Sequence, residues 1–425
     1  MKTVWQFLYN FIVIPHLYAA LRLLGFFNSK TQRGINGRKR VFENIIITAL
    51  RLDKSRPVIW FHSSSLGEFE QAKPIIQKLK KEKEVNLIVT FFSPSGYENS
   101  LKYPYADIVS YIPFDTAHNA KTFIHIVRPA IAIMMRYDIW PNHIWTMIKE
   151  GVPVFIVDAT MRSDSTRLLP IIKNFHKYLF KDLDRILTVA EDDLQNFKKF
   201  GCTEKQLRVV GDTRFDRVYQ QSLVAKEKSL LNENLYEGKK VIVAGSTWEQ
   251  DEEIILPVFQ ALAKYEKNIL FIIAPHEPTL IHLENIENEF AGKVSTIRFS
   301  YLNNYNNEQI ILVDSIGILL SLYSYADVAF VGGGFKNSIH NVLEAAVYGI
   351  PVIFGPKIEN SKEARDLITN GGGILVKTKQ AMYRNLRTLL NDDESRNQKG
   401  KAALDYVKRN VSATSKILEE IYKYI

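Results

Sequence analysis

The sequence is poor in residues that build covalent or metal-held sites. It has one cysteine, Cys202, so it forms no internal disulfide and no cysteine-based metal site, as is typical of a reducing compartment. No two histidines lie four residues apart as on a zinc-binding helix, and the G-x-S-x-G elbow of serine hydrolases is missing. We therefore expect neither a metal nor another cofactor.

Acidic residues are too few in the first half of the chain to balance its basic ones. Residues 1–220 have 32 Lys and Arg against 21 Asp and Glu, whereas residues 221–425 have 23 against 25. The excess behind the formal charge of +9 therefore lies in the first half and predicts an anionic partner there. A membrane face or a phosphorylated lipid fits this charge. Nucleic acid does not, because no RNA-binding motif or basic recognition helix accompanies it.

Long apolar runs are scarce too, and the exception is the segment 4–27. It has about the 20 residues that span a bilayer, although Pro15, His16 and Arg22 interrupt it. Residues 1–40 contain seven Lys and Arg and no acid, which favours a main body on the cytoplasmic face of the inner membrane. We predict a membrane anchor over residues 1–28 that can be removed with folding intact. A helix lying in the membrane interface and a cleaved signal peptide are the alternatives.

From Pro57 onward, short apolar runs alternate with amphipathic stretches, which indicates βαβ units and parallel sheets. Strands are predicted over 58–62, 86–92, 130–135, 152–158 and 185–190, and then over 241–246, 269–275, 310–314, 328–333, 351–355 and 373–377. The polar segment 222–240 breaks the rhythm. We predict an α/β protein with two Rossmann-like domains, 29–221 and 241–396, facing across a cleft. Residues 222–240 would be the linker, and 397–425 a C-terminal amphipathic helix.

The segment 331–356, VGGGFKNSIHNVLEAAVYGIPVIFGP, is the most informative in the chain. It predicts a buried strand, a turn of three glycines (Gly332 to Gly334) and a helix over NVLEAAVYG. Without side chains, the backbone N–H groups of this turn could close on a phosphate at a helix N-terminus. Glu344 could then accept hydroxyls of a nucleotide ribose. An ordinary α/β turn explains the glycines equally well.

Glu68 ends the segment SSSLGE, at the junction between a predicted strand and a predicted helix. Ser65 and Glu68 match an S-x-x-E capping box, which is a purely structural explanation. The functional alternative is a general base that removes a proton from an acceptor hydroxyl, with Gly67 allowing close approach.

Three more segments follow predicted strands of the second half. Ser246 and Thr247 could cap a helix or bind an anion. Pro275 and His276 end a strand, where the imidazole could touch a base or phosphate. Backbone of the segment 316–318 could contact a nucleotide, although an ordinary turn is equally plausible.

Taken together, these motifs resemble the 3-deoxy-D-manno-octulosonic acid (Kdo) transferases of lipopolysaccharide synthesis. The likeness covers nearly the whole chain through SLGE, IWPN, GDTRFD, AGSTWEQDEE, GGGF, HNVLEAA and IFGPKIENSKEA. It implies a GT-B fold and an inverting, metal-independent transfer of Kdo from CMP-Kdo to the lipid A precursor at the inner membrane. It implies Glu68 as general base, with Asp138 and Arg214 as further catalytic candidates. The implied donor-binding residues are Ser246, Thr247, Pro275, His276, Ile316, Gly317, Ile318, Gly333, Gly334, Asn341, Val342, Leu343, Glu344, Asn360 and Glu363.

The chain also departs from the family pattern. RYDIWPN puts Arg136 and Asp138 where glutamates are usual, Arg214 replaces a lysine, and His276 stands where an arginine is usual. Three alternatives remain on sequence alone: a GT-B transferase for another nucleotide sugar, a non-hydrolysing sugar epimerase, and a two-lobed periplasmic binding protein.

Overall fold

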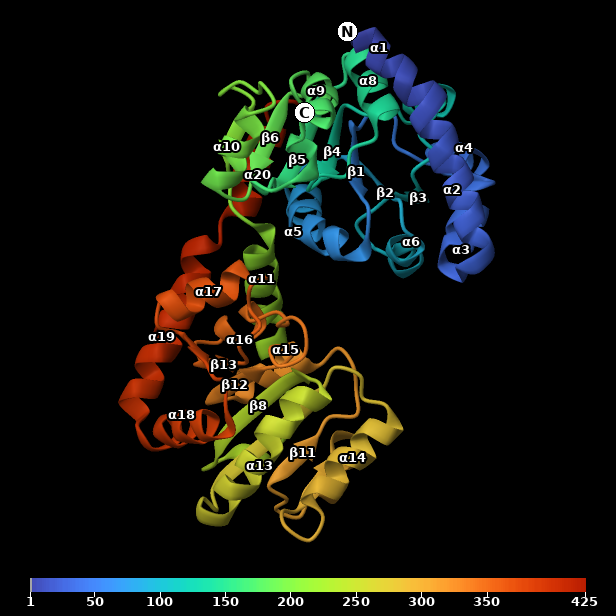
Figure 1. Cartoon of the computed structure of the whole chain (residues 1–425). Helices are drawn as coiled ribbons and strands as arrows, with labels where there is room; N and C mark the ends of the chain where they lie inside the picture. The colour runs from blue at the N-terminus through green and yellow to red at the C-terminus, as the bar shows by residue number, and fades with distance from the viewer. Residues whose placement is uncertain (1) are drawn as a thin grey trace. The chain divides into compact units, whose positions relative to one another are not determined.

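The computed structural model describes residues 2–425 and divides them into two compact units (Figure 1). Unit 1 comprises residues up to Arg217 together with Val411–Ile425, and unit 2 comprises Val218–Asn410. The division falls inside one helix, α11 (Thr213–Lys226), and not within the predicted linker 222–240. That segment is part of unit 2, where Leu231 and Leu235 are buried.

Each unit is built on a seven-stranded sheet in which all neighbouring strands are parallel. The order in unit 1 is β3-β2-β1-β4-β5-β6-β7, and in unit 2 it is β10-β11-β9-β8-β12-β13-β14. The strands of unit 1 are β1 (Val58–Ser63), β2 (Asn86–Phe91), β3 (Ile108–Tyr111), β4 (Ile131–Met135), β5 (Val154–Ala159), β6 (Arg185–Thr188) and β7 (Leu207–Val209). Those of unit 2 are β8 (Lys240–Thr247), β9 (Ile269–Pro275), β10 (Thr296–Arg298), β11 (Ile310–Leu312), β12 (Val328–Val331), β13 (Val352–Phe354) and β14 (Gly373–Leu375). The α/β fold class of the GT-B type is confirmed.

Helices cover both faces of each sheet. Those of unit 1 are α1 (Lys2–Leu8), the π-helix η1 (Tyr9–Val13), α2 (Ile14–Phe27), α3 (Ser29–Arg38), α4 (Val41–Ala49), α5 (Leu66–Glu82), α6 (Pro94–Ser100), α7 (Ala117–Val127), α8 (Pro141–Lys149), η2 (Thr166–Leu168), α9 (Pro170–Phe180), α10 (Glu191–Lys198), the start of α11, and α20 (Ala413–Ile421). Those of unit 2 are α12 (Glu233–Tyr236), α13 (Glu249–Tyr265), α14 (Leu280–Phe290), η3 (Phe299–Asn304), α15 (Leu319–Leu322), η4 (Tyr323–Tyr325), α16 (Leu343–Ala346), α17 (Lys362–Thr369), α18 (Lys379–Asn391) and α19 (Asp393–Asn410).

The core of unit 1 follows the two-residue period of its strands. On β1, Trp60 faces the cluster under α4, α7, α8 and α9, whereas Ile59 and Phe61 face the cluster under α5 and α20. Burial on both faces explains why the predicted strands appear in the sequence as continuous apolar runs. The strands that the sequence did not reveal, β3, β7 and β10, are three or four residues long and lie at sheet edges.

The predicted C-terminal helix is two helices, α19 and α20, which belong to different units. Ser412 interrupts them with φ 171° and ψ −5°. The buried carboxylate of Asp216 then accepts the N–H groups of Ala413 at 3.2 Å and Thr414 at 3.3 Å. A side chain distant in sequence therefore caps the start of α20, which no local pattern reveals.

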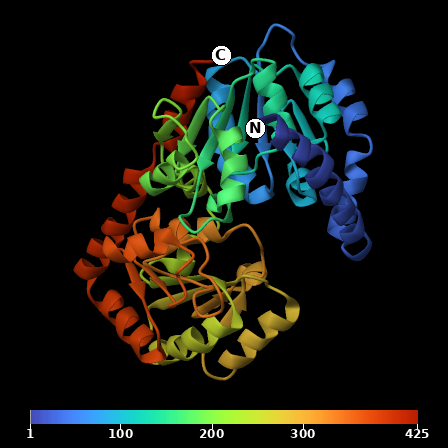
Figure 2. The same ribbon diagram turned by 45° about the horizontal axis from the view of Figure 1, so that its top comes forward.

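The N-terminal segment forms one helix from Lys2 to Phe27, which by length and composition could cross a membrane. Pro15 does not end it. Because Pro15 has no N–H to donate, the helix widens one turn earlier into the π-helical stretch 9–13. Figures 1 and 2 show this dark blue helix lying along one side of unit 1.

Buried contacts hold this helix on unit 1. Tyr9 donates to Asp115 at 2.8 Å, and the Asn10 amide donates to Asn142 at 3.1 Å. Tyr9 and Ile14 both belong to the unit 1 core. Residues 2–28 are thus integrated into unit 1, and the expectation that the segment 1–28 can be removed with folding intact conflicts with this packing.

Candidate active site

Glu68 lies in the first turn of α5, directly after β1. Its Oε2 accepts the Ser64 N–H at 2.7 Å, and its own N–H points to the Ser65 hydroxyl at 3.5 Å. The capping box of Ser65 and Glu68 is therefore present, because the carboxylate helps to order the start of α5. This contact uses only one carboxylate oxygen, so Oε1 can still meet another partner.

The surroundings of Glu68 make its carboxylate more basic than usual. Burial raises its pKa, and the Ser64 N–H opposes this. The negative charge of Asp138 raises the pKa further, while Arg136 and His62 lower it, and the net shift is upward. A carboxylate with a raised pKa is a better proton acceptor once ionised, as a general base requires.

Asp138 is held by a fixed chain of hydrogen bonds. His62 Nε2 lies 2.8 Å from its Oδ2, and Trp140 Nε1 donates to the same oxygen at 3.4 Å. His62 Nδ1 lies 2.9 Å from the Thr90 hydroxyl, which accepts the Trp60 indole N–H at 2.8 Å. Trp140 Nε1 also lies 3.2 Å from His62 Nε2, so its N–H is shared between the imidazole and the Asp138 carboxylate.

The Asp138 carboxylate stays ionised beside Glu68. Burial raises the pKa of Asp138, but hydrogen bonds from His62, Trp140 and Ser64 outweigh burial and hold the pKa below its usual range. Two carboxyl groups with pKa values moved in opposite directions are characteristic of sites that use one of them for proton transfer.

Arg136 adds a positive charge close to Glu68. Its backbone adopts a left-handed φ of 61°, and its charge lowers the pKa values of both Glu68 and Asp158. Asp158 is buried, and burial together with the neighbouring Asp212 raises its pKa. Arg214 lies next to this pair, with its Nε donating to Asp212 at 2.9 Å.

The structure thus brings Glu68 and Asp138 together at the carboxyl ends of neighbouring strands β1 and β4. Arg214 instead lies at the start of α11, paired with Asp212. The sequence pattern does not single out His62, although this residue ends a predicted strand, where catalytic side chains often lie. It marks Arg136 only as a departure from a family pattern.

In unit 2, Thr247 and Ser246 lie at the end of β8 and not in the first turn of α13. The Thr247 hydroxyl is buried and donates to Glu252 at 2.7 Å. Trp248 is the N-cap residue of α13, and Asp251 accepts its N–H at 3.0 Å. Ser246 has a left-handed φ of 54°, which turns the chain at the strand end. The predicted capping roles of Ser246 and Thr247 therefore belong to Trp248 and Asp251.

The three glycines serve close packing of backbones. A Cβ on Gly332 would lie 2.2 Å from the Ser246 carbonyl oxygen, and one on Gly334 would lie 2.8 Å from backbone of the loop after β13. The Gly333 N–H donates to Asp251 at 2.7 Å. Because Asp251 already occupies that donor, the prediction that the Gly333 N–H closes on a phosphate conflicts with this geometry.

His276, which follows Pro275 at the end of β9, belongs to a stack of rings. Its imidazole lies 4.7 Å from the Trp248 ring and 4.3 Å from the His340 ring. Lys336 Nζ lies 3.1 Å from the Trp248 ring centroid, and Trp248 Nε1 donates to His340 at 2.9 Å. Burial lowers the pKa of His340 to about 4. This stack of rings with a lysine over it combines His276, a predicted residue, with Trp248, His340 and Lys336, which the sequence did not single out.

The segment 341–344 lies after β12, but its helix is shorter than predicted. α16 covers only residues 343–346, so Val342 precedes it and Leu343 begins it. The Asn341 amide donates to Glu344 at 3.0 Å, and the Glu344 charge raises the pKa of Tyr348, which burial has already raised, to about 12.

The remaining predicted donor residues also lie beyond strand ends. Gly317 has a left-handed φ of 86°, between the exposed Ile316 and the half-buried Ile318. Asn360 donates to Ser338, and Glu363, in the first turn of α17, accepts the Ser361 hydroxyl at 3.1 Å. The predicted donor residues of unit 2 therefore lie at or after the carboxyl ends of β8, β9, β11, β12 and β13, which are consecutive strands of one sheet.

Across residues 2–425, no three His, Cys, Asp or Glu side chains gather in a group that could hold a metal ion. Cys202 is buried, which raises the pKa of its thiol to about 12, so it is a poor nucleophile.

Comparison with solved structures identifies the fold. The chain resembles a UDP-GlcNAc 2-epimerase from Neisseria meningitidis, solved with UDP-GlcNAc, with a TM-score of 0.61 and 16% identity over 86% of this chain and 100% of that one. A putative UDP-N-acetylglucosamine 2-epimerase from Listeria monocytogenes gives a TM-score of 0.57 at 16% identity, over 86% of this chain and 96% of that one. At such identities the likeness concerns the fold alone.

Sequence comparison identifies the family. A family model described as 3-deoxy-D-manno-octulosonic-acid transferase (kdotransferase) matches residues 39–217. The transferase of that name from Aquifex aeolicus is 30% identical, over 82% of this chain and 92% of its own length. The one from Haemophilus influenzae is 27% identical over 99% of both. The chain belongs to the 3-deoxy-D-manno-octulosonic acid transferase family and is a glycosyltransferase of lipopolysaccharide synthesis.

Proposed function

We propose that this enzyme transfers Kdo from CMP-Kdo to the lipid A precursor, lipid IVA, with inversion of configuration and without a metal ion. The observation that carries the proposal is the Glu68 carboxylate at the carboxyl end of β1, with its raised pKa and with Asp138 and Arg136 beside it. The basic first half and the apolar N-terminal helix suit an acceptor that is an anionic lipid.

In this mechanism Glu68 takes the proton of an acceptor hydroxyl as its oxygen attacks the anomeric carbon of Kdo. The new C–O bond forms on the face opposite the departing phosphate, so a single displacement inverts the configuration. The bond between Kdo and the phosphate of CMP breaks, CMP leaves with the electron pair, and Glu68 holds the proton. Asp138 and His62 are positioning residues that keep the polar surroundings of Glu68 fixed.

The donor would bind unit 2 at the ends of β8, β9, β11 and β12. CMP carries one phosphate, whose charge a few cationic and N–H groups can balance without a metal. His276 stands where an arginine is usual in the family, and Lys336, over the Trp248 ring, supplies a positive charge close by. Glu344 and Asn341 remain the proposed contacts to the nucleotide, and Asn360 and Glu363 the outer ones.

We propose that the N-terminal helix lies on the cytoplasmic face of the inner membrane and does not cross it. Crossing would pull Tyr9 and Asn10 away from Asp115 and Asn142, leaving polar groups unpaired in hydrocarbon. The side that unit 1 leaves uncovered is apolar, with Phe26 83% and Phe27 90% exposed. Such a helix lies in the membrane–water interface with its apolar side toward the hydrocarbon core.

The test is to incubate the purified full-length protein with a CMP-Kdo-generating system and lipid IVA and to weigh the product. We expect a mass increase of one or more Kdo residues, unaffected by EDTA. CMP- and UDP-linked sugars tested in parallel decide the donor class. Transfer from a UDP-sugar but not from CMP-Kdo, or loss of transfer with EDTA, would contradict the proposal.

A further inference from the structure

Unit 1 contains a cavity of about 670 Å³ beneath the N-terminal helices. This volume lies in the range of about 300–1,000 Å³ that is usual for ligand sites. It is open to solvent on one side and is bordered by α2, α3, α4 and the segments that follow β2 and β3. The apolar side chains that line it include Ile14, Leu21, Ile35, Phe42, Phe92 and Phe114. A wall of this composition fits a hydrocarbon chain.

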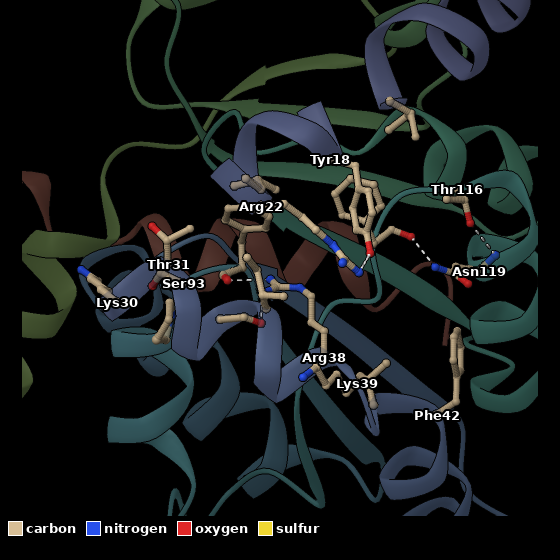
Figure 3. A pocket seen from close by; sticks show the side chains of 18 of the residues that line it. Tyr18, Arg22, Lys30, Thr31, Arg38, Lys39, Phe42, Ser93, Thr116 and Asn119 are labelled. Carbon is tan, nitrogen blue, oxygen red and sulfur yellow. Dashed lines mark hydrogen bonds between the residues drawn. The ribbon is translucent and has the colours of Figure 1, made fainter. Parts of the chain in front are cut away.

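The charged groups of the cavity have one sign. Its lining includes Arg22, Lys30, Arg38 and Lys39 but no Asp or Glu. Arg38 is committed to the protein, since it donates to the carbonyls of Phe92 at 2.6 Å and Ile112 at 3.1 Å. Arg22, Lys30 and Lys39 are exposed. In Figure 3 Lys30 lies at the edge of the group of side chains, whereas Arg22 lies at its centre beside Tyr18.

The cavity adjoins the candidate base through two short connections. Phe92 lines it and stacks on Trp140 at 4.8 Å, and Trp140 donates to Asp138. Ser93 also lines it, and its N–H donates to the Ser64 carbonyl at 2.9 Å, next to the Ser64 N–H that binds Glu68. A ligand in the cavity is therefore separated from the Glu68 site by one aromatic pair and one backbone hydrogen bond.

We propose that this cavity is the subsite for one acyl chain of the lipid acceptor. A phosphate of the head group would lie at the basic rim, which consists of the exposed side chains of Arg22, Lys30 and Lys39. The inference rests on the proposed function, and it assigns the part of the acceptor that unit 1 recognises. An apolar cavity with an exposed cationic rim is complementary to an anionic lipid and to neither a sugar nor a neutral hydrocarbon. Each buried methylene should strengthen binding by about fourfold.

Filling the cavity tests this assignment. Thr31 lines it from α3, whereas Asn36 is exposed on the same helix and does not. With detergent-dispersed lipid IVA, Thr31→Trp should raise the acceptor KM at least about tenfold, equivalent to displacing two methylenes. The donor KM, and the rate with a fully deacylated lipid IVA backbone, should stay unchanged. Asn36→Trp is the matched control and should behave as wild type.

A second variant and its matched control test the basic rim. Lys39→Ala should raise the KM for lipid IVA several-fold, whereas Arg40→Ala, one residue further and outside the lining, should not. An unchanged acceptor KM in both Thr31→Trp and Lys39→Ala, or an equal loss of rate with acylated and deacylated acceptors, would overturn the subsite. If the wild-type protein used neither acceptor, the proposed function would fail instead.

A binding measurement does not depend on turnover. The fluorescent fatty acid cis-parinaric acid should bind wild-type protein and Asn36→Trp with increased emission, and Thr31→Trp should lose that signal while keeping its Tm. Lipid IVA should displace the probe at lower concentration than phosphatidylglycerol does. Equal displacement by the two lipids would identify a general lipid site and contradict an acceptor subsite.

Discussion

The Glu68 carboxylate has a structural and a chemical use in the same turn of α5. Glu68→Gln keeps an oxygen for the Ser64 N–H, so the Tm should change little, but an amide cannot take a proton. We expect turnover to fall by about 10²–10⁴-fold with CMP affinity unchanged. Ser65→Ala is the control: it removes the cap at a cost of about 0.5–2 kcal/mol and leaves the base. Near wild-type turnover in Glu68→Gln would show that Glu68 only helps to cap α5 and is not the base.

The ionisation of Asp158 should make the free energy of unfolding depend on pH. Burial and Asp212 raise its pKa in the folded state, so the folded protein binds this proton more tightly than the unfolded chain. The stabilisation is complete below the ordinary pKa of about 4 and is lost as the pH rises through the raised value. Asp158→Asn, which cannot ionise, should flatten the fall in unfolding free energy above about pH 4. Urea titrations at several pH values would show it, and an unaltered slope would contradict the assignment.

At the scale of elements, the start of α20 depends on one side chain of α11. Asp216→Ala leaves the buried N–H groups of Ala413 and Thr414 without their acceptor. The unfolding free energy should fall by about 1–3 kcal/mol. Asp405→Ala, an exposed aspartate of α19, is the control and should change it little. Equal stability of both variants would show that α20 needs no cap.

The turn after β12 should be equally sensitive to a single methyl group. Gly332→Ala places a Cβ 2.2 Å from the Ser246 carbonyl oxygen, so the end of β8 and the turn after β12 must separate. We expect a loss of about 1–3 kcal/mol and weaker CMP binding by calorimetry. Gly67→Ala, whose Cβ would meet nothing closer than 4.0 Å, should cost no stability. Unchanged CMP affinity in a folded Gly332→Ala protein would separate this turn from the donor site.

At the scale of the whole molecule, the N-terminal helix joins the fold to the membrane. Its exposed side includes Phe7, Phe11, Phe26 and Phe27, whereas Tyr9 lies in the core. Replacing those four phenylalanines by serine should release the protein from membranes without lowering the Tm. Deleting residues 2–28 should instead destabilise unit 1, because it removes Tyr9 from Asp115.

Alkaline carbonate extraction of the full-length protein distinguishes the two membrane arrangements. A helix that lies in the interface should be extracted, whereas one that crosses the bilayer should sediment with the vesicles. Thermal denaturation of the deletion variant is the second measurement. A deletion variant with a wild-type Tm would restore the expectation, drawn from sequence, that the segment is a removable anchor.

The sequence by itself determined the α/β class, eleven of the strands and the strand ends at which the candidate site lies, because buried parallel strands are continuous apolar runs. It also indicated Glu68 through its position at such an end, whereas Asp138 was reached only through the family resemblance. Only the tertiary structure decided what depends on partners distant in sequence. Asp216 divides the last helix in two, Asp251 takes the Gly333 N–H, and His62 fixes Asp138. The sequence also left open whether the apolar N-terminal segment stands alone or packs on unit 1. The reason is that hydropathy measures the affinity of a side chain for an apolar environment, but not which apolar surface covers that side chain.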